Sequence, residues 1–257
     1  MTICIIPARG GSKRIPRKNV RPFLGVPAIA RTVATVQAAT VADRIIVSTD
    51  DDEVAAIARS AGADVPGLRP GDLADDHTTT VEVVRHALES WTPDLSAGTS
   101  VLVVYPTAVL LRPEDLTEGF RRFTGRPAGF LMPVVRYRHP VERRVHLTDD
   151  GRVRVVAPQH AATRTQDLPV SYHDAGQFYI GSRDAWFTTT PMASPDTIAY
   201  ELGTDRIVDI DTEEDWRSAE RLARLLDDGP LRHLRLRHSD SWSASAHEPG
   251  RAVPGER

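Results

Sequence analysis

The chain has 257 residues with a formal net charge of −3, and 40% of its residues are hydrophobic. That length fits one α/β domain or two small ones, with enough apolar residues for a sizeable core. The nearly neutral charge excludes bulk attraction to nucleic acid or to a membrane surface, and no apolar stretch approaches the roughly 20 residues of a membrane helix.

Cys4 is the single cysteine, which excludes an internal disulfide, and we expect it to be a buried core thiol. It stands in the first apolar run, Ile3–Ile6, which is too short for a signal peptide. We therefore expect a cytoplasmic protein that binds neither membranes nor nucleic acid.

The first expected element is a strand over Thr2–Ile6, followed by a glycine pair and a run of cations. The glycines are Gly10 and Gly11, and the cations are Arg9, Lys13, Arg14, Arg17 and Lys18. Glycine lets backbone approach a ligand closely, and exposed N–H groups in such a loop cradle anions. Arginine offers a forked donor and lysine a mobile point charge, both of which suit phosphate. The segment predicts a strand, a phosphate loop and a helix, with a nucleoside triphosphate as ligand.

Strand-like apolar runs then alternate with helical patterns. The further strands that we expect are Arg44–Ser48, Ser100–Val104, Phe130–Val135, Gln177–Ile180 and Ile207–Ile210. Helical periodicity or start signals mark five helices: one with Ile29, Val33 and Val36 on one face; one that starts at the acids Asp50–Glu53 and ends near Gly62; one lined by Val81, Val84, Leu88 and Trp91; one over Arg112–Phe123; and one from about Thr212 to Leu226. The alternation predicts a Rossmann-like, mostly parallel sheet with helices on both faces. Ligands of such sheets bind beyond the carboxyl ends of the strands, where the glycine loop lies.

Two regions depart from the alternation. Residues 136–172 are rich in Arg and His, with short polar strands and no long helix, and we interpret them as an excursion from the sheet. Residues 227–257 are too sparse in apolar residues for a core, and we expect a flexible C-terminal tail. Residues 1–226 then form one domain.

The glycine loop matches neither the Walker A motif nor the dinucleotide fingerprint, so a P-loop ATPase and a dinucleotide enzyme lose their main support. Asp209 and Asp211 close the last expected strand, where residues i and i+2 face the same side. Two converging carboxylates suit a Mg²⁺ ion that also takes phosphate and water ligands. The alternative is that Asp211 merely precedes a helix cap and that Asp209 is solvated.

The loop resembles the signature of the CMP-sugar synthetases, the acylneuraminate-type cytidylyltransferases. The segments that carry the resemblance are Ile6–Asn19, Val47–Asp51, Leu68–Pro70, Leu73–Asp76, Tyr105–Thr107 and Asp209–Thr212. It covers about residues 1–226 and implies a fold of the nucleotide-diphospho-sugar transferase type. It also implies the activity, which is transfer of CMP from CTP to the anomeric hydroxyl of a nonulosonic acid with release of pyrophosphate.

Within the family, three segments resemble the pseudaminate branch: Tyr105–Ala108, Arg164–Leu168 and Tyr172–Tyr179. Sialate-activating relatives usually carry Gln-Pro-Thr-Ser-Pro-Leu-Arg at Tyr105–Leu111 and Asn-Gly-Ala at Ala175–Gln177. Val109 stands where a proline is common in the pseudaminate branch. The resemblance therefore implies pseudaminic acid as acceptor, and legionaminic, sialic and Kdo-type acids remain alternatives.

The resemblance assigns roles to individual residues. The catalytic set is Arg9, Lys18, Asp209 and Asp211, with the two aspartates also holding Mg²⁺. The nucleotide-binding set is Ala8, Arg9, Gly10, Gly11, Ser12, Lys13, Lys18, Asn19, Arg69, Asp76, Thr80 and Tyr105. The sugar-binding set is Arg164, Gln166, His173 and Gln177. The family also implies a homodimer in which the excursion, residues 136–172, contacts the partner and reaches its site.

The remaining charges of these segments have simpler interpretations. We expect Arg14 and Arg17 to be solvated or paired, and the acids Asp50–Asp52 to be helix-start charges. Two other protein classes stay open. A phosphatase using Asp-x-Asp is disfavoured, because its nucleophile normally follows the first strand, where Arg9–Gly11 stand here. A non-catalytic nucleotide-binding protein would carry the same loop.

Overall fold

The structure is a computed structural model that describes residues 1–124 and 129–226, so the tail expected over residues 227–257 lies outside it. Its strands are β1 (Thr2–Pro7), β2 (Pro22–Phe23), β3 (Val26–Pro27), β4 (Arg44–Ser48), β5 (Ser100–Val104), β6 (Phe130–Arg136), β7 (Val145–Leu147), β8 (Val153–Val155), β9 (Tyr172–Asp174), β10 (Phe178–Ser182) and β11 (Ile198–Glu201). Its α-helices are α1 (Ala28–Ala39), α2 (Asp52–Ser60), α3 (Thr80–Trp91), α4 (Pro113–Phe123), α5 (Arg183–Phe187) and α6 (Glu213–Leu225). None of these helices is long and apolar enough to cross a membrane.

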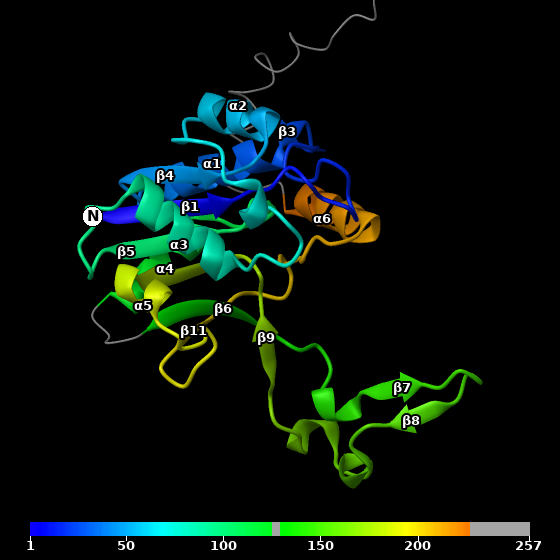
Figure 1. Cartoon of the computed structure of the whole chain (residues 1–257). Coiled ribbons are helices and arrows are strands. Elements are labelled where there is room, and N and C mark those ends of the chain that lie inside the picture. The colour runs from blue at the N-terminus through cyan, green and yellow to red at the C-terminus, as the bar shows by residue number, and fades with distance from the viewer. Residues whose placement is uncertain (125–128, 227–257) are drawn as a thin grey trace, which may run out of the picture.

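The central sheet has the strand order β11-β6-β10-β5-β1-β4, with β9 also paired to β6 (Figure 1). Strand β1 runs parallel to β4 and β5, and β11 runs parallel to β6. Strand β10 is antiparallel to both of its neighbours, and β9 is antiparallel to β6. The mostly parallel sheet predicted from the sequence is confirmed.

Alternate residues of β1 point into two different cores. Cys4 packs in the cluster that contains Val33 of α1, on the face that α4 also covers. Ile3 packs in the cluster that contains Leu88 of α3. The expected burial of Cys4 is confirmed, and that burial raises the pKa of its thiol. Helices therefore cover both faces of the sheet, as expected.

The predicted helices form where their start signals stand. Asp51 accepts a hydrogen bond from the Val54 amide at the start of α2. Thr212 and Asp215 form the capping box that begins α6, and Pro113 opens α4. These local hydrogen bonds satisfy amides that a helix leaves free at its first turn.

The strand predicted over Ile207–Ile210 is wrong, because this segment is irregular and pairs with no strand of the described chain. Ile210 is buried under a helix instead, in a third cluster with Trp216 of α6 and Phe23 of β2. Ile207 is partly buried and packs against the cluster that contains Cys4. The sequence pattern therefore predicted the burial of Ile210 correctly, but it did not predict that a helix would cover this residue. The edge strand β11, which had no clear periodic signal, takes the place beside β6.

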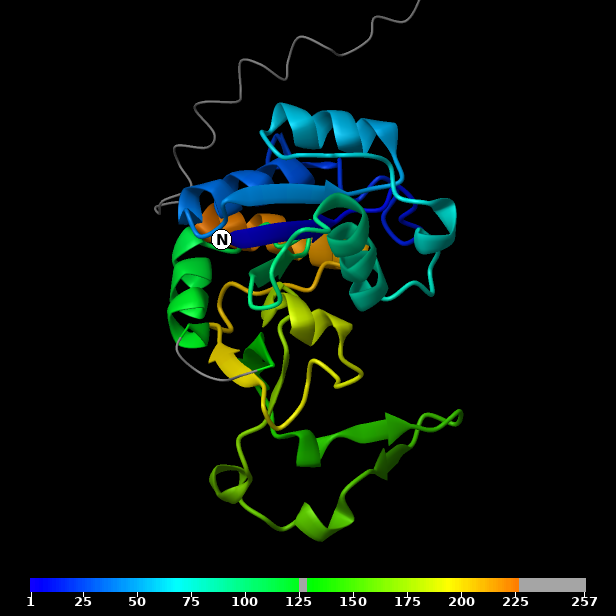
Figure 2. The ribbon, with the colours of Figure 1, turned by 60° about the vertical axis from the view of Figure 1, so that its left-hand side comes forward.

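The excursion leaves the sheet after β6 and returns at β9, and it extends away from the sheet in both ribbon views (Figures 1 and 2). It contains the two-stranded ribbon β7–β8 and the short 3-10 helices Val141–Arg143, Pro158–His160 and Thr165–Asp167. Short strands without a long helix are what its composition predicts.

Candidate nucleotide site

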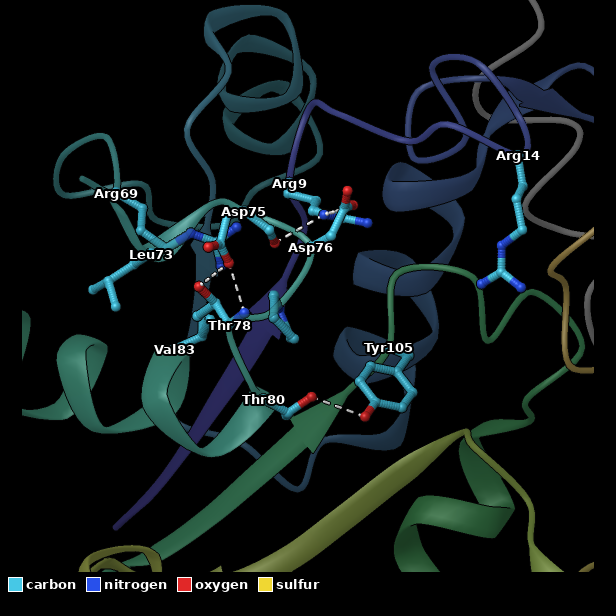
Figure 3. Close-up of a pocket in the computed structure, with 11 residues that line it drawn as sticks. Arg9, Arg14, Arg69, Leu73, Asp75, Asp76, Thr78, Thr80, Val83 and Tyr105 are labelled. Carbon is cyan, nitrogen blue, oxygen red and sulfur yellow. Dashed lines mark hydrogen bonds and ion pairs between the residues drawn. The ribbon is translucent and has the colours of Figure 1, made fainter. Parts of the chain in front are cut away.

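A cavity of about 430 Å³ opens at the carboxyl end of β1 and β5, and Figure 3 shows the residues around it. Its walls are Pro7, Arg9, Arg14, Arg69, Leu73, Asp75, Asp76, Thr78, Thr80, Val83 and Tyr105. The glycine loop, Ala8–Asn19, forms one side, and the segment between η1 (Gly71–Leu73) and α3 forms another. Three guanidinium groups line a space with polar walls, which suits an anionic ligand.

The first cations of the glycine loop are held by the opposite wall. Arg9 Nη1 donates to Asp76 Oδ1 at 2.7 Å and to the Asp75 carbonyl at 2.9 Å. Lys13 forms an ion pair with the same Asp76 carboxylate. These two cations, Lys13 first, lower the pKa of Asp76 to about 2. Asp76 therefore stays ionised and pairs with two cations of the loop.

Gly10 is required by close packing. Its amide donates to Asp50 Oδ1 at 2.9 Å. A Cβ at this position would come 2.7 Å from the Cβ of Asp51, closer than such atoms approach. At Gly11 an added Cβ would meet nothing within 4 Å. The loop backbone is thus fixed at one glycine and open at the next, and the Ser12 amide turns back to the Gly10 carbonyl at 3.1 Å.

At the other end of the loop, Lys18 joins the segment that carries the two aspartates. Its Nζ donates to the Ile210 carbonyl at 2.7 Å and lies 3.6 Å from Asp211 Oδ1. Burial lowers the pKa of Lys18, an effect that Asp211 and Asp209 oppose. Burial and the charge of Asp211 raise the pKa of Asp209. The two carboxylates therefore share one electrostatic environment, although the segment that carries them is not a strand.

Two nearly buried polar side chains stand behind the loop. Asn19 Nδ2 donates to the Arg9 carbonyl at 2.8 Å, while its Oδ1 has no partner among the described residues. Arg69 is 5% exposed and places Nη2 3.8 Å from Asp50 Oδ1. Burial lowers the pKa of Arg69, and Asp50 opposes that effect. Ala8, which is fully buried, ties the start of the loop to β4 through the Ser48 carbonyl at 2.8 Å.

The lower wall of the cavity is a chain of hydroxyl groups. Thr80 Oγ1 lies 2.9 Å from the Tyr105 hydroxyl (Figure 3). The Tyr105 ring packs edge-on against Tyr179, whose hydroxyl donates to Asp174 Oδ2 at 2.6 Å. Burial raises the pKa of Tyr179, so it remains a donor. These contacts connect the cavity to the turn after β9.

The predicted sugar-binding residues do not gather at the cavity of this chain. Arg164 and Gln166 are exposed on the excursion, where Arg164 pairs with Asp167 at 2.7 Å. His173 is exposed on β9 and packs on Tyr137. Gln177 is 3% exposed and donates to the carbonyls of the turn before it, and its own carbonyl accepts the Tyr105 amide.

For some of the residues that shape the site, the sequence predicted only a structural role or exposure to solvent. Asp51 and Asp52 are helix-start charges of α2, as predicted, but Asp50 precedes the helix and holds the Gly10 amide. Arg14 is paired, as expected, but its partner is Asp211, and it also lines the cavity. Arg17 pairs with Asp51 and so fixes the far side of the loop. The sequence contains loop cations and acidic residues in similar numbers, but it does not indicate which cation pairs with which acid.

A mostly parallel α/β sheet with a cationic loop and a polar cavity at its carboxyl edge defines a nucleotide-binding α/β protein. A family model described as Cytidylyltransferase matches residues 3–231. The chain belongs to this cytidylyltransferase family, which is an enzyme family.

Two curated relatives align over nearly their whole length, and a third over about half of its length. The chain is 34% identical over 223 residues to a pseudaminic acid cytidylyltransferase of Campylobacter jejuni, covering 87% of this chain and 96% of that protein. It is 29% identical to the CMP-N,N'-diacetyllegionaminic acid synthase of Legionella pneumophila, with the same shares covered. An N-acylneuraminate cytidylyltransferase of Escherichia coli is 27% identical, over 84% of this chain and 51% of that protein.

Solved structures share the fold. A CMP:2-keto-3-deoxy-manno-octonic acid synthetase in complex with CTP superposes with a TM-score of 0.64 at 15% identity, covering 88% of this chain and 99% of that one. The 4-diphosphocytidyl-2C-methyl-D-erythritol synthase of Anaerococcus prevotii gives 0.59 at 13% identity, with 87% and 98% covered. Both are nucleotidyltransferase folds, which confirms the fold class expected from the resemblance.

Proposed function

We propose that this chain transfers CMP from CTP to the anomeric hydroxyl of a nonulosonic acid, with pseudaminic acid as the acceptor, and releases pyrophosphate. The observation that carries the proposal is the cationic glycine loop along a polar cavity, in a chain that aligns with 96% of a curated pseudaminic acid cytidylyltransferase. Because its triphosphate substrate is a cytoplasmic metabolite, we propose that the enzyme works in the cytoplasm.

The triphosphate would lie along the loop. Arg9, Lys13 and Lys18 would each contact phosphate oxygens, and the open backbone at Gly11 and Ser12 would pack against them. Arg9 and Lys13 are at present held by Asp76, so the nucleotide has to exchange with that carboxylate. The base and ribose would take the side of the cavity formed by Arg69, Asp76, Thr80 and Tyr105, with Asn19 behind the loop. Asn19 Oδ1 and Arg69 Nε have no hydrogen-bond partner among the described residues.

Asp209 and Asp211 suit a Mg²⁺ ion. Their donors are hard carboxylate oxygens, and burial together with the charge of Asp211 raises the pKa of Asp209. No group of three or more metal-ligating side chains occurs in residues 1–124 and 129–226, so the remaining ligands would be phosphate and water. Bound there, Mg²⁺ would neutralise the phosphates and polarise the acceptor hydroxyl.

The protein's own contribution is positioning and charge neutralisation at the α-phosphate. Lys18 is fixed by the Ile210 carbonyl and stands between the loop and the aspartates, so it would meet the developing charge without reorganising. The proton of the acceptor hydroxyl would pass to a carboxylate of this pair. The acceptor oxygen would then form a bond to the α-phosphorus, while the bond between the α-phosphorus and pyrophosphate breaks and pyrophosphate leaves.

The acceptor site would be completed by a second copy of the chain. Arg164 and Gln166 stand on the excursion, which extends away from the sheet (Figure 2) and contributes no residue to the cavity of its own chain. One face of its β7–β8 ribbon carries the exposed apolar residues Val145, Leu147, Val153 and Val155, paired across the strands. Exposed apolar patches of this kind mark interaction surfaces. We propose a homodimer in which Arg164 binds the sugar carboxylate, with Gln166, His173 and Gln177 at its polar groups.

The reaction is tested by following pyrophosphate release with CTP, Mg²⁺ and each candidate acid: pseudaminic, legionaminic, sialic and Kdo. We expect release that requires the acid, is fastest with pseudaminic acid and is lost in Asp209→Asn. Release without any acid, or unchanged release in that variant, would contradict the proposal. CTP binding without release with any of the four acids would instead favour a non-catalytic nucleotide-binding protein.

The dimer is tested separately with Leu147→Asp, which places a charge on the apolar face of the ribbon. We expect a dimer for the unaltered chain and a monomer for the variant in sedimentation velocity, with CTP affinity retained and turnover lost. A fully active monomer at micromolar concentration would contradict the shared acceptor site. Arg154→Asp, on the opposite face of the same ribbon, is the matched control.

A further inference from the structure

We propose that Arg14 is an exchangeable cation that couples metal binding to nucleotide binding. Its guanidinium neutralises Asp211 in the free enzyme and moves onto the polyphosphate when a divalent cation takes its place. The inference rests on the proposed function, because it takes Asp209 and Asp211 as the metal ligands.

The first observation is that one carboxylate oxygen serves two cations. Arg14 Nη2 lies 2.9 Å from Asp211 Oδ1, and Lys18 Nζ lies 3.6 Å from the same atom. A metal ion that binds Asp211 must therefore compete with a positive charge already in contact with its ligand oxygen. Both cations weaken metal binding as long as they stay.

The second observation is that the two cations differ in freedom. Lys18 has a side chain that is 20% exposed, and it is fixed by the Ile210 carbonyl. Arg14 has a side chain that is 67% exposed, and it also lines the nucleotide cavity. Figure 3 shows it extending from the glycine loop at a place apart from Arg9 and Arg69. Arg14 is therefore the cation that can leave Asp211 and still remain in contact with the site.

The charge balance gives the exchange its direction. Asp209, Asp211 and the neighbouring Asp215 carry three negative charges, against which Lys18 and Arg14 place two positive charges in the free enzyme. A divalent cation added to that group leaves an excess of positive charge in a half-buried place, and the polyphosphate supplies the opposite charge. Transfer of the Arg14 guanidinium from Asp211 to phosphate reduces the excess of positive charge around the metal ion. It also places a positive charge next to the polyphosphate. Because such coupling is reciprocal, metal then strengthens nucleotide binding as much as nucleotide strengthens metal binding.

The first test measures Mn²⁺ binding to the full chain without nucleotide, by the electron paramagnetic resonance signal of free Mn²⁺. We expect Arg14→Gln to bind Mn²⁺ about two- to fivefold more tightly than the unaltered enzyme, the range that an exposed ion pair supports. Arg17→Gln is the matched control, because Arg17 belongs to the same loop but pairs with Asp51. If Arg14 had only a structural role, Arg14→Gln would bind Mn²⁺ as tightly as the unaltered enzyme, or more weakly.

The second test measures CTP affinity by calorimetry, once with saturating Mn²⁺ and once with EDTA. With EDTA, Arg14 stays on Asp211, so we expect Arg14→Gln to match the unaltered enzyme. With Mn²⁺, Arg14 contacts phosphate, so the variant should lose at least about fivefold, since hydrogen bonds to charged groups are the stronger ones. An equal loss in both conditions would overturn the exchange.

Asp209→Asn separates failure of the exchange from failure of the metal site. If this variant loses Mn²⁺ binding while Arg14→Gln binds it no more tightly than the unaltered enzyme, the exchange is overturned and the metal site stands. If Asp209→Asn binds Mn²⁺ as well as the unaltered enzyme, the metal site fails and the exchange fails with it.

Discussion

Replacing Gly10 by alanine tests whether the glycine loop is fixed by close packing. The new Cβ would lie 2.6 Å from Asp51 Oδ2 and 2.7 Å from Asp51 Cβ, and the latter cannot rotate away. Overpacking of this kind costs about 1–3 kcal/mol. Moving Asp51 would also weaken the N-cap of α2, which adds roughly 0.5–2 kcal/mol. We expect Gly10→Ala to lose about 2–4 kcal/mol of unfolding free energy.

Gly11→Ala is the matched control, because its Cβ would meet no protein atom within 4 Å. We expect the two variants to separate in two assays. Urea unfolding should detect the loss in Gly10→Ala and little change in Gly11→Ala. Calorimetry with CTP should detect weaker binding in Gly11→Ala if the triphosphate packs on that backbone. A Gly10→Ala protein as stable as the unaltered chain, with the same CTP affinity, would refute the close approach of the loop to α2.

Three further outcomes follow from single contacts. Arg206→Gln should lose about 3 kcal/mol in urea unfolding, because it leaves the Asp115 carboxylate, 3% exposed, without its ion-pair partner; equal stability to Arg138→Gln, at an exposed arginine, would contradict this. Asp76 should titrate near pH 2 by NMR, so its stabilising effect is present above the ordinary pKa of 3.8 and lost as the pH falls through about 2; an unchanged midpoint in Lys13→Gln would exclude Lys13 as the main cause. Cys4 should resist a thiol reagent until the protein unfolds, since it is fully buried; rapid labelling of the folded protein would show that β1 opens.

The fold was largely predictable because its strands and helices bury continuous apolar faces. Runs such as Arg44–Ser48 are covered on both sides and therefore carry a signal that does not depend on the partner. The segment Ile207–Ile210 carried the same kind of signal, but its one buried residue, Ile210, packs against α6 instead of pairing in the sheet. Apolar periodicity reports that a residue is buried and leaves open what covers it.

The site was predictable as a set of residue types but not as a set of contacts. The glycine pair and the cations of the loop indicate an anion, whereas their partners are carboxylates that follow β4 or precede α3 and α6. Asp50 illustrates the difference, because its neighbour Asp51 caps a helix while Asp50 holds the loop. Only the three-dimensional arrangement separates the two. The excursion shows a second limit, since a residue such as Arg164 gains its proposed role from another copy of the chain.

Each cation of the glycine loop has a carboxylate partner, and this has a consequence for how a polyanion enters. Arg9 and Lys13 share Asp76, Arg14 and Lys18 share Asp211, and Arg17 pairs with Asp51. Without these acids, five like charges within ten residues would repel one another and open the loop. The acids therefore hold the cations close to the positions that a triphosphate needs, which lowers the ordering cost of binding. The nucleotide must displace Asp76, and together with the metal ion it must displace Asp211, but Asp51 keeps its partner, so the loop exchanges its partners at the cavity while its far side stays fixed.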